Sequence, residues 1–526
     1  ICSGLVGSEM CIRDRMWSWR NILEMFNPRL FFAGSTLLLL LFLIFEWNTQ
    51  DKKQKLERSV ELQSDFIPTD TINIRNNNLD LYIDLNDGSL RKAYVLEKQE
   101  RDGLFKTRLM SDDESLRFYF KSSVSGFANN SPFVVESFSD DYLKISADDA
   151  SGNTLTKTYY FEDKHILFVE DRLDLSTATF GTVPFFKTFY RENKKSIDYG
   201  VSFSRDHLAY STSEDVFNDE QLSSVSKRED YLGHWVGYSQ KHFVVAVFND
   251  EEQQKLSLYP MDRNGLYRFG LTEDPVIENG QLVSQTKIYI GPKQKDILEV
   301  VAPHFKYNLD LGFVYGIGEW FIVLLNFFYG WVGNWGVAII LLTILFKAVL
   351  SPLQIMQINS MVKMRRLQPK LQEIQERHKN DRQKLGMEMM QLYSKEKFNP
   401  FAGCFPMIPQ IPIFLAMFWV TREAFEFRGE SFLWIPDLAE SDPFLITPIL
   451  MGVMMYLSQK MMPKPPQSSQ GMQAQIAQQM MVVFPPMITL IFLFMPAGVV
   501  IYSVINMALS IIPQVLILGR VEKTSG

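Results

Sequence analysis

The chain has 526 residues, a formal net charge of −7 and only three cysteines. Hydrophobic residues make up 46% of it, yet its mean hydropathy is near zero. This combination indicates membrane spans joined to a large water-soluble part, argues against a nucleic-acid-binding protein, and excludes a disulfide framework in the soluble part. The sequence has no phosphate loop, HExxH or CxxC motif, so we predict a non-enzymatic protein without cofactor or metal.

The N-terminal region is expected to hold the first membrane span. Residues 1–15 do not begin with Met and match nothing that follows, so we interpret them as a non-native leader. Residues 16–29 carry Arg20 and Arg29 just before an apolar run at 30–46, and acidic residues follow that run. Because positive residues stay inside, we predict a cytoplasmic N-terminus and an uncleaved signal anchor.

A polar linker at 47–78 is followed by a long region with a different pattern. From 79 to 312, runs such as LDLYIDL (79–85), HFVVAVF (242–248) and TKIYIG (286–291) alternate apolar and polar residues between turn-forming clusters. This alternation predicts a large antiparallel β-sandwich. An outside domain without cysteine pairs suits a bacterial periplasm.

Most of the six histidines fall in this predicted sandwich without metal-ligand spacing, and packed or surface roles are expected for His165, His207, His234 and His242. The domain could bind a sugar or a peptide, but no pattern points to such a ligand.

Residues 313–332 are rich in aromatic side chains and contain Glu319. They predict an amphipathic helix in the outer membrane interface, where Trp and Tyr prefer to lie. A full membrane span is the alternative. Gly333 and Asn334 separate this segment from the next span, and a span here would give that next one the wrong orientation.

The second predicted span, 333–357, carries a cation in its interior. Lys347 costs roughly 2.5–3.5 kcal/mol there on insertion scales, which makes it a functional hypothesis by default. Thr343, Ser351 and Gln354 fall at i−4, i+4 and i+7 from Lys347, so we expect all four to share one helix face. The alternatives are that Lys347 snorkels to the cytoplasmic headgroups or forms a structural ion pair.

Residues 358–398 contain ten Lys and Arg against five Asp and Glu. Apolar residues recur there at three- and four-residue spacing on both sides of a turn at 378–381. The pattern predicts a cytoplasmic helical hairpin with one basic face. The basic face follows the positive-inside rule, and it could also be a docking surface at the membrane mouth.

The rest of the chain predicts four more spans with both termini in the cytoplasm. Gln410 lies among three prolines in the first of them, where freed backbone carbonyls need partners. The predicted segments are a span at 399–422, an acidic outside loop at 423–442, a span at 443–459, a cytoplasmic loop at 460–476, spans at 477–495 and 497–518, and a cytoplasmic tail at 519–526.

The last span carries a second polar stripe. Tyr502, Asn506, Ser510 and Gln514 step by four, so they share one helix face. Interhelical hydrogen-bond glue is the structural alternative. If this stripe faces the Lys347 helix, the two helices enclose a wet groove that is open to the cytoplasm. Such a groove would accept a polar segment of another chain while its apolar part leaves into lipid.

Five stretches together resemble one family. They are VGNWGVAIILLTILFKAVLSPL, MVKMRRLQPKLQEIQER, EKFNPFAGCFPMIPQIPIFLAMF, DPFLITPILMGVMMY and FMPAGVVIYSVINMALSIIPQ. They are similar in order to the YidC/Oxa/Alb membrane protein insertases over about 313–520, and the N-terminal span and β-domain fit the Gram-negative form. The fold class expected is a multi-domain membrane protein with six transmembrane helices, five of them an insertase core, plus a periplasmic β-sandwich.

The resemblance implies insertion of nascent membrane proteins, alone or with the Sec translocon, without nucleotide hydrolysis. It also implies inner-membrane location, contact with lipids, and no direct contact with nucleic acid. Ribosome and signal recognition contacts are a further expectation, although the C-terminal tail is short. The family's groove cation is usually Arg, and the matching residue here is Lys347. The groove residues expected are Lys347, Thr343, Ser351, Gln354, Gln410, Tyr502, Asn506, Ser510 and Gln514.

Two other functions remain open from the residues alone. A small-solute transporter or channel would need a path to both sides and usually internal repeats, which are not evident. A membrane-anchored periplasmic sugar- or peptide-binding module would need a pocket that the spacing does not reveal.

Overall fold

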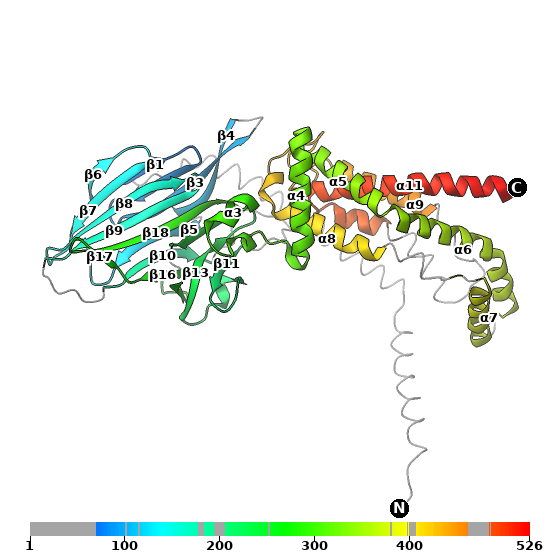
Figure 1. Cartoon of the computed structure of the whole chain (residues 1–526), viewed down its shortest axis with the longest axis horizontal. Helices are drawn as coiled ribbons and strands as arrows, with labels where there is room; N and C mark the ends of the chain where they lie inside the picture. The colour runs from blue at the N-terminus through cyan, green and yellow to red at the C-terminus, as the bar shows by residue number, and fades with distance from the viewer. Residues whose placement is uncertain are drawn as a thin grey trace, which may run out of the picture.

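The computed structural model describes residues 70–99, 103–113, 116–176, 183–193, 206–250, 253–378, 381–396, 398, 407–460, 483 and 485–525. The predicted leader, first span and most of the linker therefore lie outside the described residues, as does nearly all of the loop predicted at 460–476. Figure 1 shows an elongated molecule with a β-domain at one end and helices at the other.

The β-domain is wholly antiparallel. One layer runs β1-β2-β3-β5-β10-β16-β15-β13 and the other β6-β7-β8-β9-β18-β14-β13, so β13 belongs to both. The strands are β1 Thr71–Arg75, β2 Leu79–Asp84, β3 Ser89–Gln99, β4 Gly103–Asp113, β5 Leu116–Val124, β6 Val134–Phe138, β7 Tyr142–Asp148, β8 Thr154–Asp163, β9 Ile166–Asp174, β10 Phe185–Glu192, β11 His207–Thr212, β12 Asn218–Glu220, β13 Glu229–Ser239, β14 Phe243–Phe248, β15 Gln254–Tyr259, β16 Leu266–Glu273, β17 Val276–Glu278 and β18 Gln281–Pro292.

The alternating sequence pattern produces the sandwich core. Along β9, buried residues alternate with half-buried ones, and Leu167 and Val169 join Phe118 and Phe189 in one apolar cluster. The predicted antiparallel β-domain is thereby confirmed. It begins earlier than expected, because β1 lies where the sequence predicted linker and pairs with β2. A five-residue strand has little pattern of its own, and its pairing partner decides its structure.

The sandwich core also holds charges. Lys157 and Lys187 both contact Asp171, with Lys157 Nζ 3.1 Å from Asp171 Oδ1, and all three side chains are at most 1% exposed. Ser122 donates to the same carboxylate, and its carbonyl accepts from Lys157 at 2.7 Å. Burial raises the pKa of Asp171, but the two ammonium groups and the Ser122 hydroxyl outweigh burial and hold that pKa well below its usual range.

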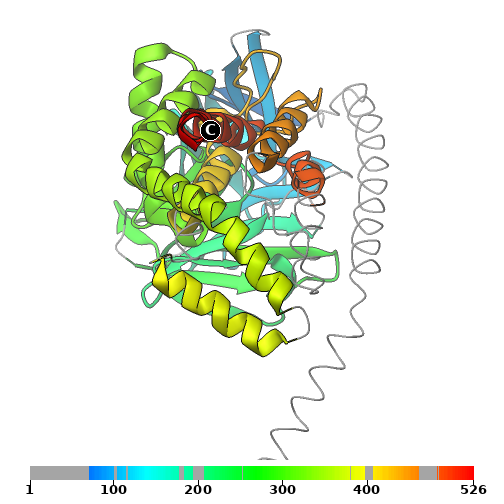
Figure 2. The same ribbon diagram turned by 90° about the vertical axis from the view of Figure 1, so that its right-hand side faces the viewer.

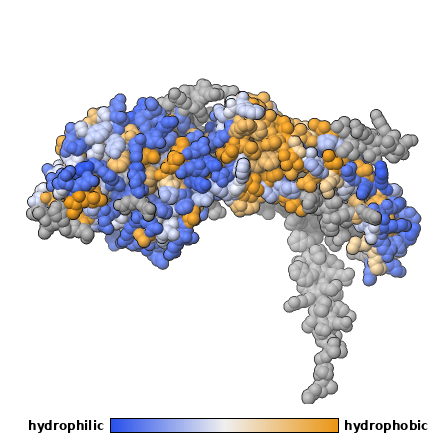
Figure 3. All heavy atoms as spheres, in the orientation of Figure 1, coloured by the Kyte–Doolittle hydropathy of each residue, from blue (hydrophilic) through white to orange (hydrophobic). Residues whose placement is uncertain are grey.

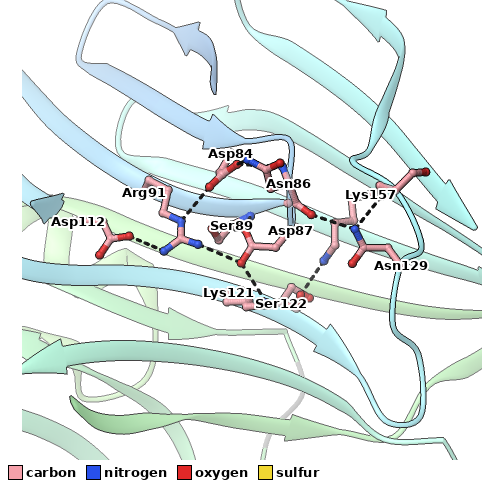
Figure 4. Close-up of polar contacts among 12 residues, drawn as sticks. Asp84, Asn86, Asp87, Ser89, Arg91, Asp112, Lys121, Ser122, Asn129 and Lys157 are labelled. Atoms are coloured by element: carbon pink, nitrogen blue, oxygen red, sulfur yellow. Dashed lines mark hydrogen bonds and ion pairs between the residues drawn. The ribbon is translucent and has the colours of Figure 1, made fainter. Parts of the chain in front are cut away.

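A second charged network lies on the neighbouring strands (Figure 4). Arg91 of β3 lies between Asp84, Asp87 and Asp112, and Lys121 of β5 is 2.9 Å from Asp87. These residues are partly exposed, unlike the Asp171 cluster. They tie β2, β3, β4 and β5 together at the surface.

The helical part follows the β-domain. Its elements are α3 Lys295–Val301, α4 Tyr315–Val332, α5 Trp335–Val349, α6 Ser351–Arg377, α7 Arg382–Lys395, α8 Met407–Glu423, α9 Ile446–Lys460 and α11 Ala497–Ser525, with short 3-10 turns η1 Leu222–Ser224, η2 Phe305–Asn308, η3 Gly312–Val314 and η5 Phe425–Phe427. Helix α11 packs against α5, α8 and α9, while α6 and α7 form the hairpin that projects from the bundle (Figures 1 and 2).

The predicted second span is not one continuous helix. Its described part divides at Leu350 into α5 and α6, which meet at an angle of 63°. The reason is Pro352 in the first turn of α6. Proline has no N–H to continue the ladder and disfavours helical geometry in the residue before it.

The six-span count is not established by the described residues. Two helices there are long and apolar enough to cross a membrane, Gly312–Val332 and Ala497–Val515, and the bent α5–α6 pair is a third candidate. Helices α8 and α9 have only 17 and 15 residues. Apolar residues nevertheless dominate the visible surface of the bundle around α4, whereas the projecting α7 end is mostly hydrophilic (Figure 3).

Charged contacts join the β-domain to the helices. Lys241 lies 2.7 Å from Glu440, Arg428 lies 2.7 Å from Glu97, and His242 is within 3.3 Å of the carbonyl of Glu423. Glu423 ends α8, so the β-domain rests directly on the end of that helix.

Candidate functional site

The cation predicted from the sequence lies between two helices. Lys347 Nζ, on α5, donates to Asn506 Oδ1 at 3.0 Å and to Ser510 Oγ at 2.6 Å, both on α11. No carboxylate among the described residues is paired with this ammonium group. Its charge is therefore held by neutral acceptors, and Asn506 and Ser510 of the predicted α11 stripe face Lys347 of α5.

A second contact lies just beyond the helix break. Gln354, in the first turns of α6, donates its Nε2 to the carbonyl of Ser510 at 3.2 Å. Ser510 therefore contacts polar residues from both sides of the α5–α6 bend. This arrangement places α5, α6 and α11 around one polar region.

A third contact joins α8 to α11. Gln410 Nε2 donates to the hydroxyl of Tyr502 at 2.5 Å. Tyr502 is 3% exposed, and its ring belongs to the apolar core of the bundle. Gln410, which the sequence analysis singled out, thus joins α8 to the polar stripe of α11.

Three of the predicted groove residues lie differently from the rest. Thr343 is buried, and its hydroxyl donates to the carbonyl of Ile339 one turn earlier. Ser351 belongs to α6 and so does not continue the α5 face. Gln514 is buried, with its Oε1 lacking a hydrogen-bond partner among the described residues. The i+4 extrapolation across Leu350 was wrong because the helix bends there.

No sequence pattern pointed to the buried charges at the junction between the β-domain and the helices. Lys293 and Glu423 are almost completely buried and lie 3.9 Å apart, while Arg422 Nε donates to Glu423 at 2.8 Å. Lys293 is far in sequence from Arg422 and Glu423, and no helix face or strand alternation connects it to them. Only their burial at the junction reveals them.

Two family descriptions match nearly all of the described chain. Residues 71–324 match the YidC periplasmic domain, and residues 327–524 match the 60Kd inner membrane protein family. The insertase YidC of Tolumonas auensis is 32% identical over 489 residues, which cover 86% of this chain and 87% of that protein. The chain belongs to the YidC family of membrane protein insertases.

A second relative and one solved structure are similar over comparable lengths. The insertase YidC of Francisella tularensis is 33% identical over 471 residues, covering 85% of this chain and 83% of the relative. A crystal structure titled as an active YidC insertase with its first transmembrane domain resolved has 19% identity and a TM-score of 0.37, covering 86% of this chain and 92% of that one. The relatives are named as insertases, and the family descriptions name an inner membrane protein and a periplasmic domain.

Within this YidC family member, α4 runs across the direction of α11 (Figures 1 and 2). Its Glu319 lies 3.0 Å from Lys295 and 3.9 Å from Lys306, both just after the β-domain strands. Trp320 and Trp331 are 70% and 74% exposed. The helix therefore presents paired charges to the β-domain side and aromatic rings to its surroundings.

Proposed function

We propose that this member of the insertase family works through a cytoplasm-open hydrophilic groove bounded by α5, α6, α8 and α11. The groove would take the polar part of an inserting segment, and the apolar part would pass sideways into lipid. The observation that carries the proposal is Lys347, a cation held between helices by the neutral acceptors Asn506 and Ser510. A permanent structural charge would be expected to have a counter-charge.

The length of α5 supports this route. Its 15 residues span about 22 Å at 1.5 Å per residue, less than the roughly 30 Å of a bilayer's hydrocarbon core. The bend at Leu350 then turns α6 away from that direction. A polar segment that enters beside α5 would have a shorter apolar distance to cross.

The membrane arrangement that fits this function has six spans, with five forming the core and both termini in the cytoplasm. The β-domain would lie in the periplasm. Helix α4 would lie in the outer interface, because paired Glu319 and exposed Trp320 suit that boundary. The basic α6–α7 hairpin would lie in the cytoplasm near the groove's mouth.

The partners of the groove would be nascent membrane proteins and lipid, with or without the Sec translocon. The hairpin offers a surface for further partners such as the ribosome and the signal recognition machinery. It combines basic residues with exposed Met387 and Met390 on α7. Flexible thioethers adapt to many apolar partners.

Site-specific photocrosslinking tests the groove. A photoreactive residue at Ser351, Gln354 or Tyr502 should crosslink to a nascent single-span membrane protein in cells. Matched positions at Ile344 of α5 and Val453 of α9, which are apolar and exposed, should crosslink mainly to lipid. Equal protein crosslinking from both sets of positions would contradict a groove.

A further inference from the structure

Ser510 is hydrogen-bonded in three directions. Its hydroxyl donates to the carbonyl of Asn506 at 2.8 Å on its own helix. That bond uses the only hydroxyl proton and leaves a lone pair for Lys347 Nζ at 2.6 Å. Its carbonyl accepts from Gln354 at 3.2 Å. One residue of α11 thus holds the last turn of α5 and the first turns of α6 together.

We infer that Ser510 is a positioning residue that keeps the cytoplasm-open groove narrow at its mouth until an inserting segment arrives. It does so through its hydrogen bonds with Lys347 and Gln354, which we call the clasp. The inference rests on the proposed function and adds a gate to it. The clasp spans the bend at Leu350, which is where α5 and α6 can change their angle with least loss of helix hydrogen bonds. The entering segment replaces Ser510 and Asn506 as the acceptor for Lys347.

Lys347 can exchange its acceptors without losing all of its hydrogen bonds at once. The ammonium group of Lys347 has three donors, and two are used by Asn506 and Ser510. The remaining donor can receive a first acceptor from the entering segment before the clasp opens. A carboxylate binds an ammonium group more strongly than a neutral amide or hydroxyl does. An acidic segment therefore opens the clasp more readily than a neutral one.

A gating role and a purely structural role of the Ser510 hydrogen bonds predict opposite changes in insertion rate when Ser510 is replaced. If Ser510 only glues the bundle, Ser510→Ala should slow insertion of every segment. If Ser510 holds a gate, Ser510→Ala should loosen the mouth and speed insertion of a neutral segment. An average interhelical hydrogen bond of about 0.6 kcal/mol corresponds to about a threefold change in rate.

The chain offers two matched variants. Ser510→Thr keeps a hydroxyl that can bond the carbonyl four residues earlier and accept from Lys347, so it should behave like the wild type. Ser503→Ala removes a serine on the same helix whose hydroxyl donates to the carbonyl of Val499 at 2.8 Å. That variant loses the same kind of local bond without touching the clasp.

Two measurements on the full chain in proteoliposomes test the inference. After Cys2, Cys11 and Cys404 are replaced by Ser, spin labels at Met356 of α6 and Val515 of α11, both exposed, report the distance across the mouth. Without any substrate, Ser510→Ala should lengthen or broaden that distance, whereas Ser510→Thr and Ser503→Ala should not. An unchanged distribution in Ser510→Ala overturns the clasp, whatever the chain inserts.

The second measurement is the initial insertion rate of one single-span test protein whose leading tail carries either Asp or Asn. Ser510→Ala should raise the rate of the Asn form about threefold and that of the Asp form by less. If Ser510→Ala lowers the insertion rate of both forms while Ser510→Thr inserts at the wild-type rate, the gate is contradicted. The hydrogen bonds of Ser510 would then serve only to hold the helices together. If the wild type inserts neither form, the proposed function fails, while the spin-label distances still decide the clasp.

Discussion

The molecule holds lysines in two contrasting surroundings. In the β-sandwich, Lys157 and Lys187 share the carboxylate of Asp171, and no member of the cluster is more than 1% exposed. In the helical bundle, Lys347 meets only the neutral oxygens of Asn506 and Ser510 among the described residues. The first cluster is buried away from any new partner, and its ammonium groups have a carboxylate as counter-charge. The second has a spare donor and an uncompensated charge, which suits a site that exchanges partners.

The largest effect that we expect is a loss of stability on replacing Asp171 in the buried cluster of the β-sandwich. Asp171→Asn would leave Lys157 and Lys187 buried without their counter-charge, and breaking a buried pair typically costs about 3–5 kcal/mol. We expect that loss in the free energy of unfolding of the β-domain, measured by chemical denaturation with tryptophan fluorescence. Asp219→Asn, at an exposed position of the edge strand β12, is the control. A change of under about 1 kcal/mol in Asp171→Asn would mean that the cluster is not a structural unit.

Substitutions of Lys347 in the helical bundle should change the insertion rate more than they change stability. Lys347→Arg keeps the charge and should be tolerated. Lys347→Glu places a carboxylate against the oxygens of Asn506 and Ser510 and should lower the insertion rate at least about tenfold, the factor for about 1.4 kcal/mol. The measurement is insertion of a single-span protein into proteoliposomes.

Lys255→Glu, a charge reversal at an exposed position of β15, controls for net charge. Equal insertion rates for Lys347→Arg and Lys347→Glu would remove the cation from the mechanism. Thermal unfolding of both variants separates a folding defect from a functional one.

The smallest expected effect concerns pH at the junction between the two regions. Burial lowers the pKa of His242 well below its usual value, and Lys241, Arg428 and Lys293 lower it further, although a hydrogen bond to the Glu423 carbonyl opposes them. The folded junction therefore holds neutral His242. The unfolded or undocked state binds a proton as pH falls through about 6.5, so junction stability is full above that pH and declines below it.

The decline cannot exceed about 1.4 kcal/mol per pH unit for one proton. Hydrogen exchange of the α8 end, compared between pH 7.5 and pH 5.5, should show faster opening at the lower pH in the wild type. His242→Gln should show a smaller difference. If both proteins respond equally to pH, groups other than His242 control the junction.

Local patterns were enough for several features. The alternation along strands such as β9 predicted the antiparallel β-domain, because side chains of a strand point to opposite faces in turn. The spacing of Tyr502, Asn506 and Ser510 predicted a polar face, because α11 is one continuous helix there. Lys347 could be singled out because a charge in an apolar span is costly wherever its partners are.

The tertiary structure decided what these residues contact. That Lys347 meets Asn506 and Ser510 depends on the packing of α5 against α11, which neither helix encodes alone. The Asp171 cluster joins strands from both layers of the sandwich, so its parts look like ordinary surface charges in the sequence. Periodicity describes one element at a time. Contacts between distant segments depend on tertiary packing, because a buried charge is costly unless it has a hydrogen-bond or ion-pair partner.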